Sequence, residues 1–410
     1  MDNVLAIIGE YNPFHNGHLY QLNEAKRLSN SNYAIALITG NFVQRGNASI
    51  VDKWTKAKMA LLNGFDLVLE LPCIYSISSA ENFALGSIKA LNSLNIVDNI
   101  SFGCETDDIS VLKEFADILC DQPEEFKSLL AHELSKGISF PKARENALLM
   151  YLNNIRKSAN VLSSPNNILA IEYLKALKIT NSSMNPIGVK RVGEGYHSEN
   201  ISGDFASATA IRKYALERNF YAIDKAMPKV CYDILEDAIK KGHYVRDIEC
   251  FEKEIMFVLR NMTVAQIANL PDVSEGLENS IKNAANSCNT LNELMNLFKS
   301  KRYTQTRIQR ILLYALLGFT KEDMETSKKI DPYIRVLGCS SKGQTLLSEI
   351  CRANKKLPVI TSVKAFTTTC RNKKLLMMLE KDIQATNIYT LGYEYDSYSN
   401  LDYTTKMLVY

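Results

Sequence analysis

Apolar residues in the first quarter of the chain follow two alternating patterns. Short, continuous apolar runs are typical of strands that are buried on both faces of a sheet, and they cover residues 4–9, 33–38, 67–71 and 99–102. Longer stretches with apolar residues three or four positions apart predict helices, and they cover residues 17–28, 52–63 and 79–94. This alternation predicts an α/β fold, with a parallel sheet covered by helices on both faces.

The pattern changes along the middle of the chain. Residues 107–180 are mostly helical and look like an insertion into the α/β unit, and one more apolar run at 186–192 predicts a strand. A further helix is expected to begin near Ala208, after a polar loop. The α/β unit with its helical insertion is therefore predicted to form one domain over residues 1–217.

Helical periodicity dominates from about residue 217 onward, and basic residues cluster there. Only 357–360 and 387–391 are apolar or β-branched enough to predict strands. We expect a second, mainly helical domain over residues 218–410.

The composition limits the class of protein. The 410 residues are 46% hydrophobic and 23% charged, as in an ordinary soluble protein of two or three domains. The formal net charge of +3 is small, so a nucleic-acid partner would have to bind a local basic surface. The nine cysteines form no C-x-x-C pair, which argues against a zinc site or a disulfide framework. With no signal-peptide pattern and no run of about 18 apolar residues, a cytoplasmic protein without a membrane span is expected.

The segment from Gly9 to His18, Gly-Glu-Tyr-Asn-Pro-Phe-His-Asn-Gly-His, joins the first strand to the first helix. Ligands bind at the carboxyl ends of strands in open parallel sheets, and a helix N-terminus offers N–H groups and a positive dipole to phosphate. His15 and His18 both lie at this helix start, where each can donate to charge that develops on an α-phosphate. Pro13 stiffens the turn and Gly17 permits close approach. The segment predicts a nucleotide site.

Two other interpretations of His15 and His18 are open. The pair could cap the helix without any chemistry, or it could bind Zn²⁺. No third ligand is close in the sequence, so we predict no metal site of this kind. The order of strand, loop and helix favours nucleotide chemistry.

A second segment, residues 205–212, reads Phe-Ala-Ser-Ala-Thr-Ala-Ile-Arg. With the first segment, it resembles the signatures of HIGH-motif nucleotidyltransferases, whose second loop, Ile-Ser-Ser-Thr-x-Ile-Arg, wraps the β- and γ-phosphates. The first serine of that pattern is an alanine here. The resemblance implies that Ser207, Thr209 and Arg212 bind phosphate, and hydroxyls with a guanidinium at a helix start suit that task. The alternative is an ordinary N-cap with a surface arginine.

The chain resembles one family of this superfamily more closely, the bacterial tRNA(Met) cytidine acetate ligases. The matching segments span about the first 215 residues and are residues 9–18, 40–46 (G-N-F-V-Q-R-G), 66–72 (D-L-V-L-E-L-P), 102–103, 165–169 (P-N-N-I-L), 190–191, 196–197 and 206–212. The resemblance implies a Rossmann-like nucleotidyltransferase domain with a helical insertion, followed by a mainly helical tRNA-binding domain.

This resemblance implies a ligase with a two-step reaction. ATP and acetate would give acetyl-adenylate and pyrophosphate, and the acetyl group would then pass to N4 of the wobble cytidine of elongator tRNA(Met), forming N4-acetylcytidine. His15, His18 and Arg212 would be catalytic, and Mg²⁺ is expected to accompany the phosphates. The implied ATP site consists of Ile7, Ile8, Gly9, Glu10, Tyr11, Asn12, Pro13, Phe14, His15, Asn16, Gly17, His18, Leu19, Tyr20, Gly103, Asn166 or Asn167, Arg191, Ser207, Thr209 and Arg212.

Two basic segments are candidates for tRNA contacts. The loop 40–46 is longer than a simple connection requires, which suggests a functional lid. Residues 299–310 carry five cations, two of which share a face of the following helix. An ordinary surface loop and a solvated helix face are the alternatives. The predicted tRNA-contact residues are Arg45, Lys301, Arg302, Arg307 and Arg310.

Two further functions compete with the ligase. The first is a small-molecule nucleotidyltransferase of cofactor biosynthesis, but its second half would be larger than such an enzyme requires. The second is an RNA-binding protein that has lost catalysis, which the intact His15, His18 and Arg212 argue against.

Overall fold

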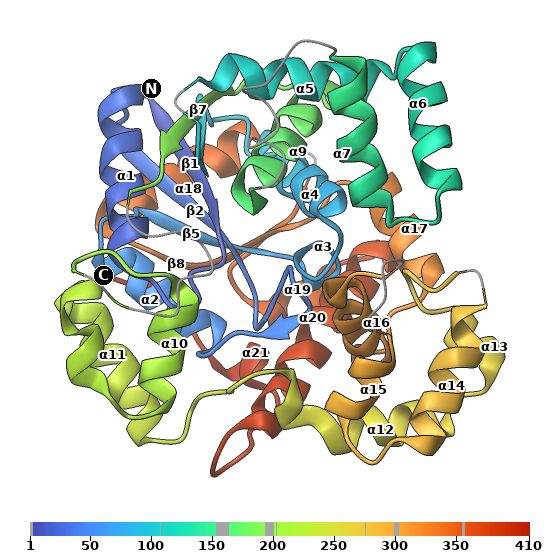
Figure 1. The fold of residues 1–410 in the computed structure, drawn as a ribbon. Helices are drawn as coiled ribbons and strands as arrows, with labels where there is room; N and C mark the ends of the chain where they lie inside the picture. The colour runs from blue at the N-terminus through green and yellow to red at the C-terminus, as the bar shows by residue number, and fades with distance from the viewer. Residues whose placement is uncertain are drawn as a thin grey trace.

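The computed structural model describes residues 3–106, 108–152, 164–192, 201, 203–274, 276–298, 303–354 and 357–410. An eight-stranded sheet crosses the middle of the molecule, with helices on both of its faces and along one end (Figure 1).

Five parallel strands form the centre of the sheet, in the order β5, β2, β1, β6, β7. Alternate side chains of β1 pack into different cores, with Val4 and Ala6 on one face and Leu5 and Ile7 on the other. This double burial explains the continuous apolar runs. The five strands, all predicted from the sequence, are β1 (Val4–Gly9), β2 (Tyr33–Thr39), β5 (Leu67–Leu71), β6 (Asn99–Cys104) and β7 (Asn185–Lys190).

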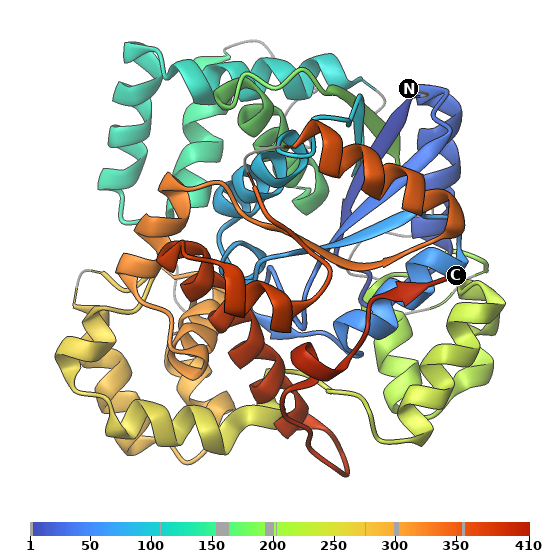
Figure 2. The same ribbon diagram turned by 180° about the vertical axis from the view of Figure 1, so that it is seen from behind.

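Helices cover both faces of this sheet. The core that contains Leu5 and Ile7 is shared by α1 (Asn16–Ser29), α2 (Lys53–Leu62), α10 (Ala208–Leu216) and α11 (Lys229–Lys240). The opposite core is shared by α4 (Ala80–Asn92), α9 (Pro165–Ile179) and α18 (Ser341–Ala353), and Figure 2 shows α18 crossing the sheet from behind. The predicted N-cap Asp52 is confirmed, because its carboxylate accepts the N–H groups of Trp54 and Thr55.

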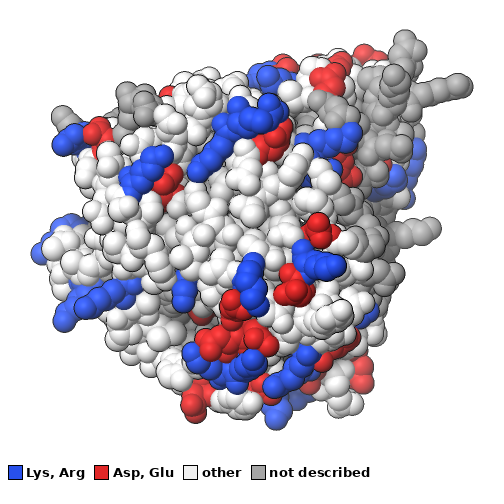
Figure 3. Space-filling view, turned by 90° about the vertical axis from the view of Figure 1, so that its left-hand side faces the viewer, with Lys and Arg blue, Asp and Glu red and all other residues white. Residues whose placement is uncertain are grey.

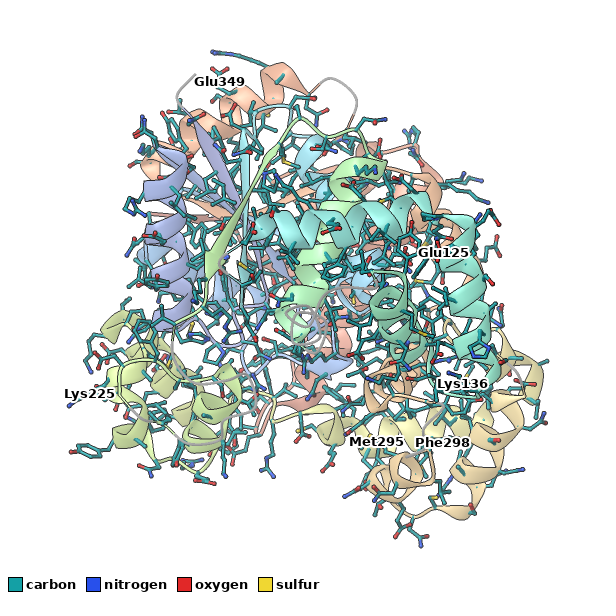
Figure 4. All side chains as sticks on the ribbon, turned by 45° about the horizontal axis from the view of Figure 1, so that its top comes forward. Glu125, Lys136, Lys225, Met295, Phe298 and Glu349 are labelled. Carbon is teal, nitrogen blue, oxygen red and sulfur yellow. The ribbon has the colours of Figure 1, made fainter. Side chains whose placement is uncertain are left out.

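The insertion between β6 and β7 is helical, as predicted. Figure 1 shows the first three of its described helices beside one another, away from the first strand, and Glu125 and Lys136 mark the two ends of the second helix in Figure 4. They are α5 (Ile109–Asp121), α6 (Glu124–Ser135) and α7 (Phe140–Tyr151).

The last part of the chain returns to the sheet. Strand β8 (Ile334–Cys339), which the sequence pattern did not predict, pairs antiparallel with β5 and carries β9 (Val359–Ile360) and β10 (Leu408–Val409) as parallel neighbours. The strand expected at 357–360 is confirmed over two residues. The division near residue 218 remains a prediction, although strands from both sides of it share one sheet.

The strand predicted at 387–391 is wrong. These residues end α20 (Lys373–Tyr389) and form the turn η3 (Thr390–Gly392). Thr386 and Tyr389 lie three positions apart on the buried side of α20, where Tyr389 donates to the Ser49 carbonyl (2.8 Å). Tertiary contacts on one helix face thus override the β-branched and aromatic composition.

Helices of the second half form a separate group beside the sheet. Figure 4 places Met295 and Phe298 in this group, far from Lys225 on the opposite side of the molecule. Its helices are α12 (Glu252–Asn261), α13 (Val264–Ala268), α14 (Leu277–Ser287), α15 (Leu291–Leu297) and α16 (Gln305–Leu317). The remaining short elements are β3 (Phe42–Val43), β4 (Asn47–Ala48), α3 (Cys73–Ser76), η1 (Phe220–Ala226), η2 (Ile248–Phe251), α17 (Lys321–Lys329), α19 (Val363–Thr369) and α21 (Leu401–Thr404). Across the described ranges, we find no helix with the length and apolar character needed to cross a membrane.

Candidate functional site

A cavity of about 520 Å³ opens at the carboxyl ends of β1, β6 and β7. It brings together the two sequence motifs, which are almost 200 residues apart in the chain. The predicted ATP-site residues that line it are Ile8, Gly9, Glu10, Tyr11, Asn12, His15, Gly17, His18, Tyr20, Gly103, Asn166, Arg191, Ser207, Thr209 and Arg212. The predicted residues outside the lining are Ile7, Pro13, Phe14, Asn16, Leu19 and Asn167.

The two histidines of the first motif form a stacked pair. His15 is the N-cap of α1, and its Nδ1 accepts the N–H of Gly17 (3.0 Å). Nδ1 of His18 in turn accepts the N–H of His15 (3.2 Å), and the ring centroids are 3.8 Å apart. The capping interpretation and the catalytic interpretation are therefore compatible, because capping uses only one nitrogen of each ring.

The electrostatics of the site keep both histidines neutral. Burial, with the charges of Arg191 and Arg212, lowers the pKa of His15 to about 3. Burial, with His15 and Arg191, also holds the pKa of His18 well below its usual value. Because each Nδ1 accepts a hydrogen bond, the proton of each neutral ring lies on Nε2. Each histidine thus presents one N–H donor and no positive charge.

Gly17 is required by the packing of this pair. A Cβ at this position would lie 2.8 Å from Cε1 of His15, which is closer than carbon atoms approach. Tyr11, with φ of 46°, is fully buried, and its ring contacts both Phe14 and His18 edge-on. Tyr11 and Phe14, of which only Phe14 lies outside the cavity lining, therefore support the ring of His18.

The second motif starts α10 and docks against the first. Ser207 is the N-cap, and its hydroxyl accepts the N–H of Ala210 (3.0 Å). Arg212 donates from Nη1 to the Asn12 carbonyl (2.7 Å) and from Nη2 to the hydroxyl of Thr209 (3.2 Å). These contacts place a guanidinium and two hydroxyls at the same end of the cavity as the histidine pair.

Another part of the cavity wall is formed by the ends of β6 and β7 and the start of α9. Asn166 lines it and donates to the Glu105 carboxylate (2.9 Å). Asn167 points away and accepts the N–H of Glu105 (2.8 Å), so it ties α9 to β6 instead of facing a ligand. A Cβ at Gly103 would be 3.6 Å from Cγ of Arg191, an ordinary contact, so the protein itself does not require glycine there.

The loop 40–46 borders the cavity and presents Gln44 and Arg45 to it. The backbone N–H of Gln44 donates to Oε1 of Glu10 (2.9 Å). Gly46, with φ of 77°, packs so closely on α16 that a Cβ would lie 2.6 Å from the backbone nitrogen of Arg310. The loop thus contacts Glu10 on one side and α16 on the other, and its role as a lid stays a prediction.

A buried lysine holds the backbone beneath this loop. Nζ of Lys56 donates to the carbonyls of Gly40 (2.7 Å), Thr39 (2.8 Å) and Glu10 (3.1 Å). Burial lowers the pKa of Lys56 to about 7. The sequence pattern did not identify this residue, since a lysine in a helix reads as a surface position.

Two of the predicted tRNA-contact arginines are engaged within the protein. Arg307 donates to the carbonyl of Asp272 (2.7 Å) and to the hydroxyl of Ser274 (2.9 Å). Arg310 is almost buried and pairs with the Asp272 carboxylate (2.9 Å). Lys301 and Arg302 lie outside the described residues, as do His197 and 355–356. On the face in Figure 3, basic and acidic side chains are interspersed around broad uncharged areas.

Several lining residues were absent from the predicted site. Lys190 is the last residue of β7 and is followed by Arg191. Two adjacent basic residues at a strand end are the sequence feature that could have identified Lys190 as a lining residue. Phe83 and Tyr173 come from α4 and α9, where aromatic residues at helical spacing indicate only a core position. Thr306 comes from α16, and no sequence feature connects it with the nucleotide motifs.

Comparison with known proteins places these residues in a family. A family model described as HIGH Nucleotidyl Transferase matches residues 2–403. A tRNA(Met) cytidine acetate ligase of Thermoanaerobacter sp. (strain X514) is 46% identical over 402 residues, covering 98% of each chain. One from Acetivibrio thermocellus is 43% identical over 397 residues, covering 95% of each chain.

Solved structures give the same result for the whole fold. The crystal structure of Thermotoga maritima TmcAL in its apo form matches with a TM-score of 0.95 and 32% identity, covering 99% of each chain. A second form of that protein, bound with alpha-thio ATP, matches with a TM-score of 0.93.

Proposed function

Because the chain belongs to the tRNA(Met) cytidine acetate ligases of the HIGH nucleotidyl transferase family, we propose that it activates acetate with ATP and acetylates a tRNA cytidine. The product would be N4-acetylcytidine at the wobble position of elongator tRNA(Met). The observation that carries the proposal is the meeting of the His15–His18 pair with Arg212 in one cavity. The alpha-thio ATP bound to the Thermotoga maritima protein supports ATP as the nucleotide.

In the first step, a carboxylate oxygen of acetate attacks the α-phosphorus of ATP and pyrophosphate leaves. Acetate is already an anion, so this step requires no general base. The Nε2–H groups of His15 and His18 would donate to the α-phosphate and bridging oxygens as negative charge develops. Neutral rings suit this task because they remain donors over a wide pH range.

The second motif would hold the rest of the triphosphate. Thr209 and Arg212 lie together at the start of α10, where N–H groups and the helix dipole also favour an anion. Arg191, which lines the cavity with Gly103 and Asn166, would also contact ATP.

We propose that Mg²⁺ enters with the nucleotide and not through a protein cage. Within the described ranges, no three His, Cys, Asp or Glu side chains form a cluster that could hold a metal. Mg²⁺ commonly retains water and binds substrate phosphates with one or two carboxylates, so phosphate oxygens would provide most of its ligands.

The tRNA would approach past the loop 40–46. Arg45 lines the cavity there and Thr306 of α16 borders the same opening. We keep Lys301, Arg302 and Arg307 as proposed backbone contacts. Arg310 is instead assigned to holding Asp272, because its guanidinium is almost fully enclosed.

The test is an assay of both steps on the intact chain. The protein is incubated with ATP, labelled acetate and Mg²⁺, and acetate-dependent exchange of pyrophosphate into ATP is measured, followed by transfer of label to bulk tRNA. Label in tRNA that appears as N4-acetylcytidine after digestion supports the proposal. Exchange without transfer would overturn the tRNA step, and exchange driven by other acceptors but not acetate would favour a small-molecule nucleotidyltransferase.

A further inference from the structure

The charges that face the cavity are unequal in number and in kind. Four basic residues line it, which are Arg45, Lys190, Arg191 and Arg212. Among the described lining residues, Glu10 is the single acidic one. A cavity that binds triphosphate and acetate, which are both anions, gains nothing from a carboxylate for binding alone. Glu10 therefore calls for an explanation.

The position of Glu10 separates it from the ends of β6 and β7. It follows directly after β1, and its carboxylate contacts the loop 40–46 through the N–H of Gln44 (2.9 Å). In the sheet order β5, β2, β1, β6, β7, this loop follows β2, whereas Gly103 lies in β6 and Arg191 follows β7. Glu10 thus contacts the loop on the side of β1 that is away from β6 and β7.

The carboxylate is held in place from two directions. Lys56 fixes the Glu10 backbone by donating to its carbonyl (3.1 Å), and the same ammonium group fixes the carbonyl of Gly40 (2.7 Å). Gln44 occupies Oε1 of the side chain, which is only partly buried. Because the Glu10 backbone and its Oε1 atom are both held by hydrogen bonds, the carboxylate keeps one orientation in the cavity wall.

No other described lining residue is suited to accept a proton there. Both histidines already use Nδ1 as an acceptor, and burial lowers the pKa of each. Burial, followed by the charge of Glu10 and then Tyr11, raises the pKa of Tyr173 well above its usual value, so that phenol stays protonated near Glu10. Glu10 is the remaining candidate.

We propose that Glu10 is the general base of the acyl-transfer step, and that it recognises the exocyclic amine of the incoming cytosine. The amine nitrogen forms a bond to the acetyl carbon, and the bond from that carbon to the phosphate oxygen breaks. The electron pair of the broken bond leaves with AMP, and one amine proton passes to the Glu10 carboxylate. Carboxylates also accept hydrogen bonds from cytosine N4 in direct base recognition. This inference rests on the proposed function and assigns one residue to its second half.

The test separates the two half-reactions in Glu10→Gln. Glutamine still offers Oε1 to the N–H of Gln44 but cannot take up a proton. Single-turnover transfer to tRNA is expected to fall about 10²- to 10⁴-fold, and by at least about tenfold more than acetate-dependent pyrophosphate exchange. The increase of the wild-type transfer rate with pH at its acidic end should be absent in the variant. Glu24→Gln on the exposed side of α1 is the matched control, with both half-reactions unchanged.

Each other outcome overturns the inference. Equal losses of exchange and transfer would place Glu10 in nucleotide or Mg²⁺ binding. Unchanged transfer would limit it to holding Gln44. If Glu10→Gln no longer unfolds cooperatively, Glu10→Asp is tested in its place. This variant is expected to transfer acetyl groups at a reduced rate that still depends on pH. Complete loss of the pH dependence would contradict the role of Glu10 as general base. Failure of the wild-type chain to label tRNA would instead refute the proposed function and is recorded before any variant.

Discussion

Two groups of charged side chains in this protein differ in the balance of their charges. The first lines the cavity at the carboxyl ends of β1, β6 and β7, with four basic residues and one described carboxylate, Glu10. The second is an enclosed ion cluster between β5, α2, β8 and α21, which consists of Lys53, Glu70, Arg335 and Asp402. Among the described lining residues, cations outnumber carboxylates in the cavity group, whereas the enclosed ion cluster has two cations and two carboxylates.

In the enclosed ion cluster, each of the two cations contacts both of the two carboxylates. Nζ of Lys53 lies 2.9 Å from Glu70 and 2.7 Å from Asp402, and Arg335 contacts the same two carboxylates. Burial alone would raise the pKa of Asp402, but Lys53 and Arg335 outweigh it and hold the pKa at about 2. A buried group balanced in this way is compatible with a structural role, and an excess of basic residues among the described lining suits the anionic ligand that we propose.

The largest effect is expected from breaking the enclosed ion cluster. Arg335→Met leaves two buried carboxylates with one cation, and the free energy of unfolding should fall by about 3–5 kcal/mol. Urea unfolding measures it, and Lys127→Met in the exposed pair with Glu124 should change it by at most about 1 kcal/mol. A folded Arg335→Met protein with impaired adenylate formation would remove the distinction between the two groups.

The second prediction concerns the cavity group. His18→Ala removes an N–H donor to the developing phosphate charge, and the rate of pyrophosphate exchange should fall about 10²- to 10³-fold. Affinity for tRNA, measured by filter binding, should stay nearly unchanged. His132→Ala on the exposed α6 is the control. Comparable losses of exchange and tRNA affinity would show that one site serves both substrates.

A smaller effect is expected from Gly46, the loop residue that packs against the backbone of α16. Alanine there must adopt φ of 77° and approach the backbone of Arg310, so stability should fall on the order of 2 kcal/mol. The displaced loop carries Arg45, so KM for tRNA should rise as well. Gly137→Ala, with φ of 71° in open space, isolates the cost of the backbone conformation. Identical changes in both variants would argue against docking of the loop on α16.

The smallest effect, counted per pH unit, is a pH dependence of stability due to His15. Its pKa is lowered to about 3 in the folded protein, so between pH of about 6.5 and 3 only the unfolded chain binds this proton. Stability present above pH 6.5 is therefore lost as the pH falls, by up to about 1.4 kcal/mol per unit. His15→Asn keeps an N-cap acceptor without a titrating ring, and its slope should be smaller by that amount. Equal slopes would indicate that His15 is not buried.

Much of the α/β half could be predicted because its signals are local. A strand buried on both faces must be apolar throughout, so Val4–Gly9 and Leu67–Leu71 are visible in the sequence. The wrong assignment at 387–391 and the missed β8 both lie where a tertiary contact decides. Tyr389 is buried and its hydroxyl donates a hydrogen bond to the Ser49 carbonyl. Residues 334–339 form the strand β8 because they pair with the edge of β5.

The site divides in the same way. The sequence by itself determined the nucleotide chemistry, since His15, Gly17 and His18 act within one helix turn that their own spacing creates. Only the tertiary structure decided that Arg310 holds a loop, that Asn167 supports the fold, and that Glu10 is the one described carboxylate of the cavity. A short motif encodes its own geometry through local hydrogen bonds. The role of a lone charged residue depends on which distant groups the folded chain brings against it.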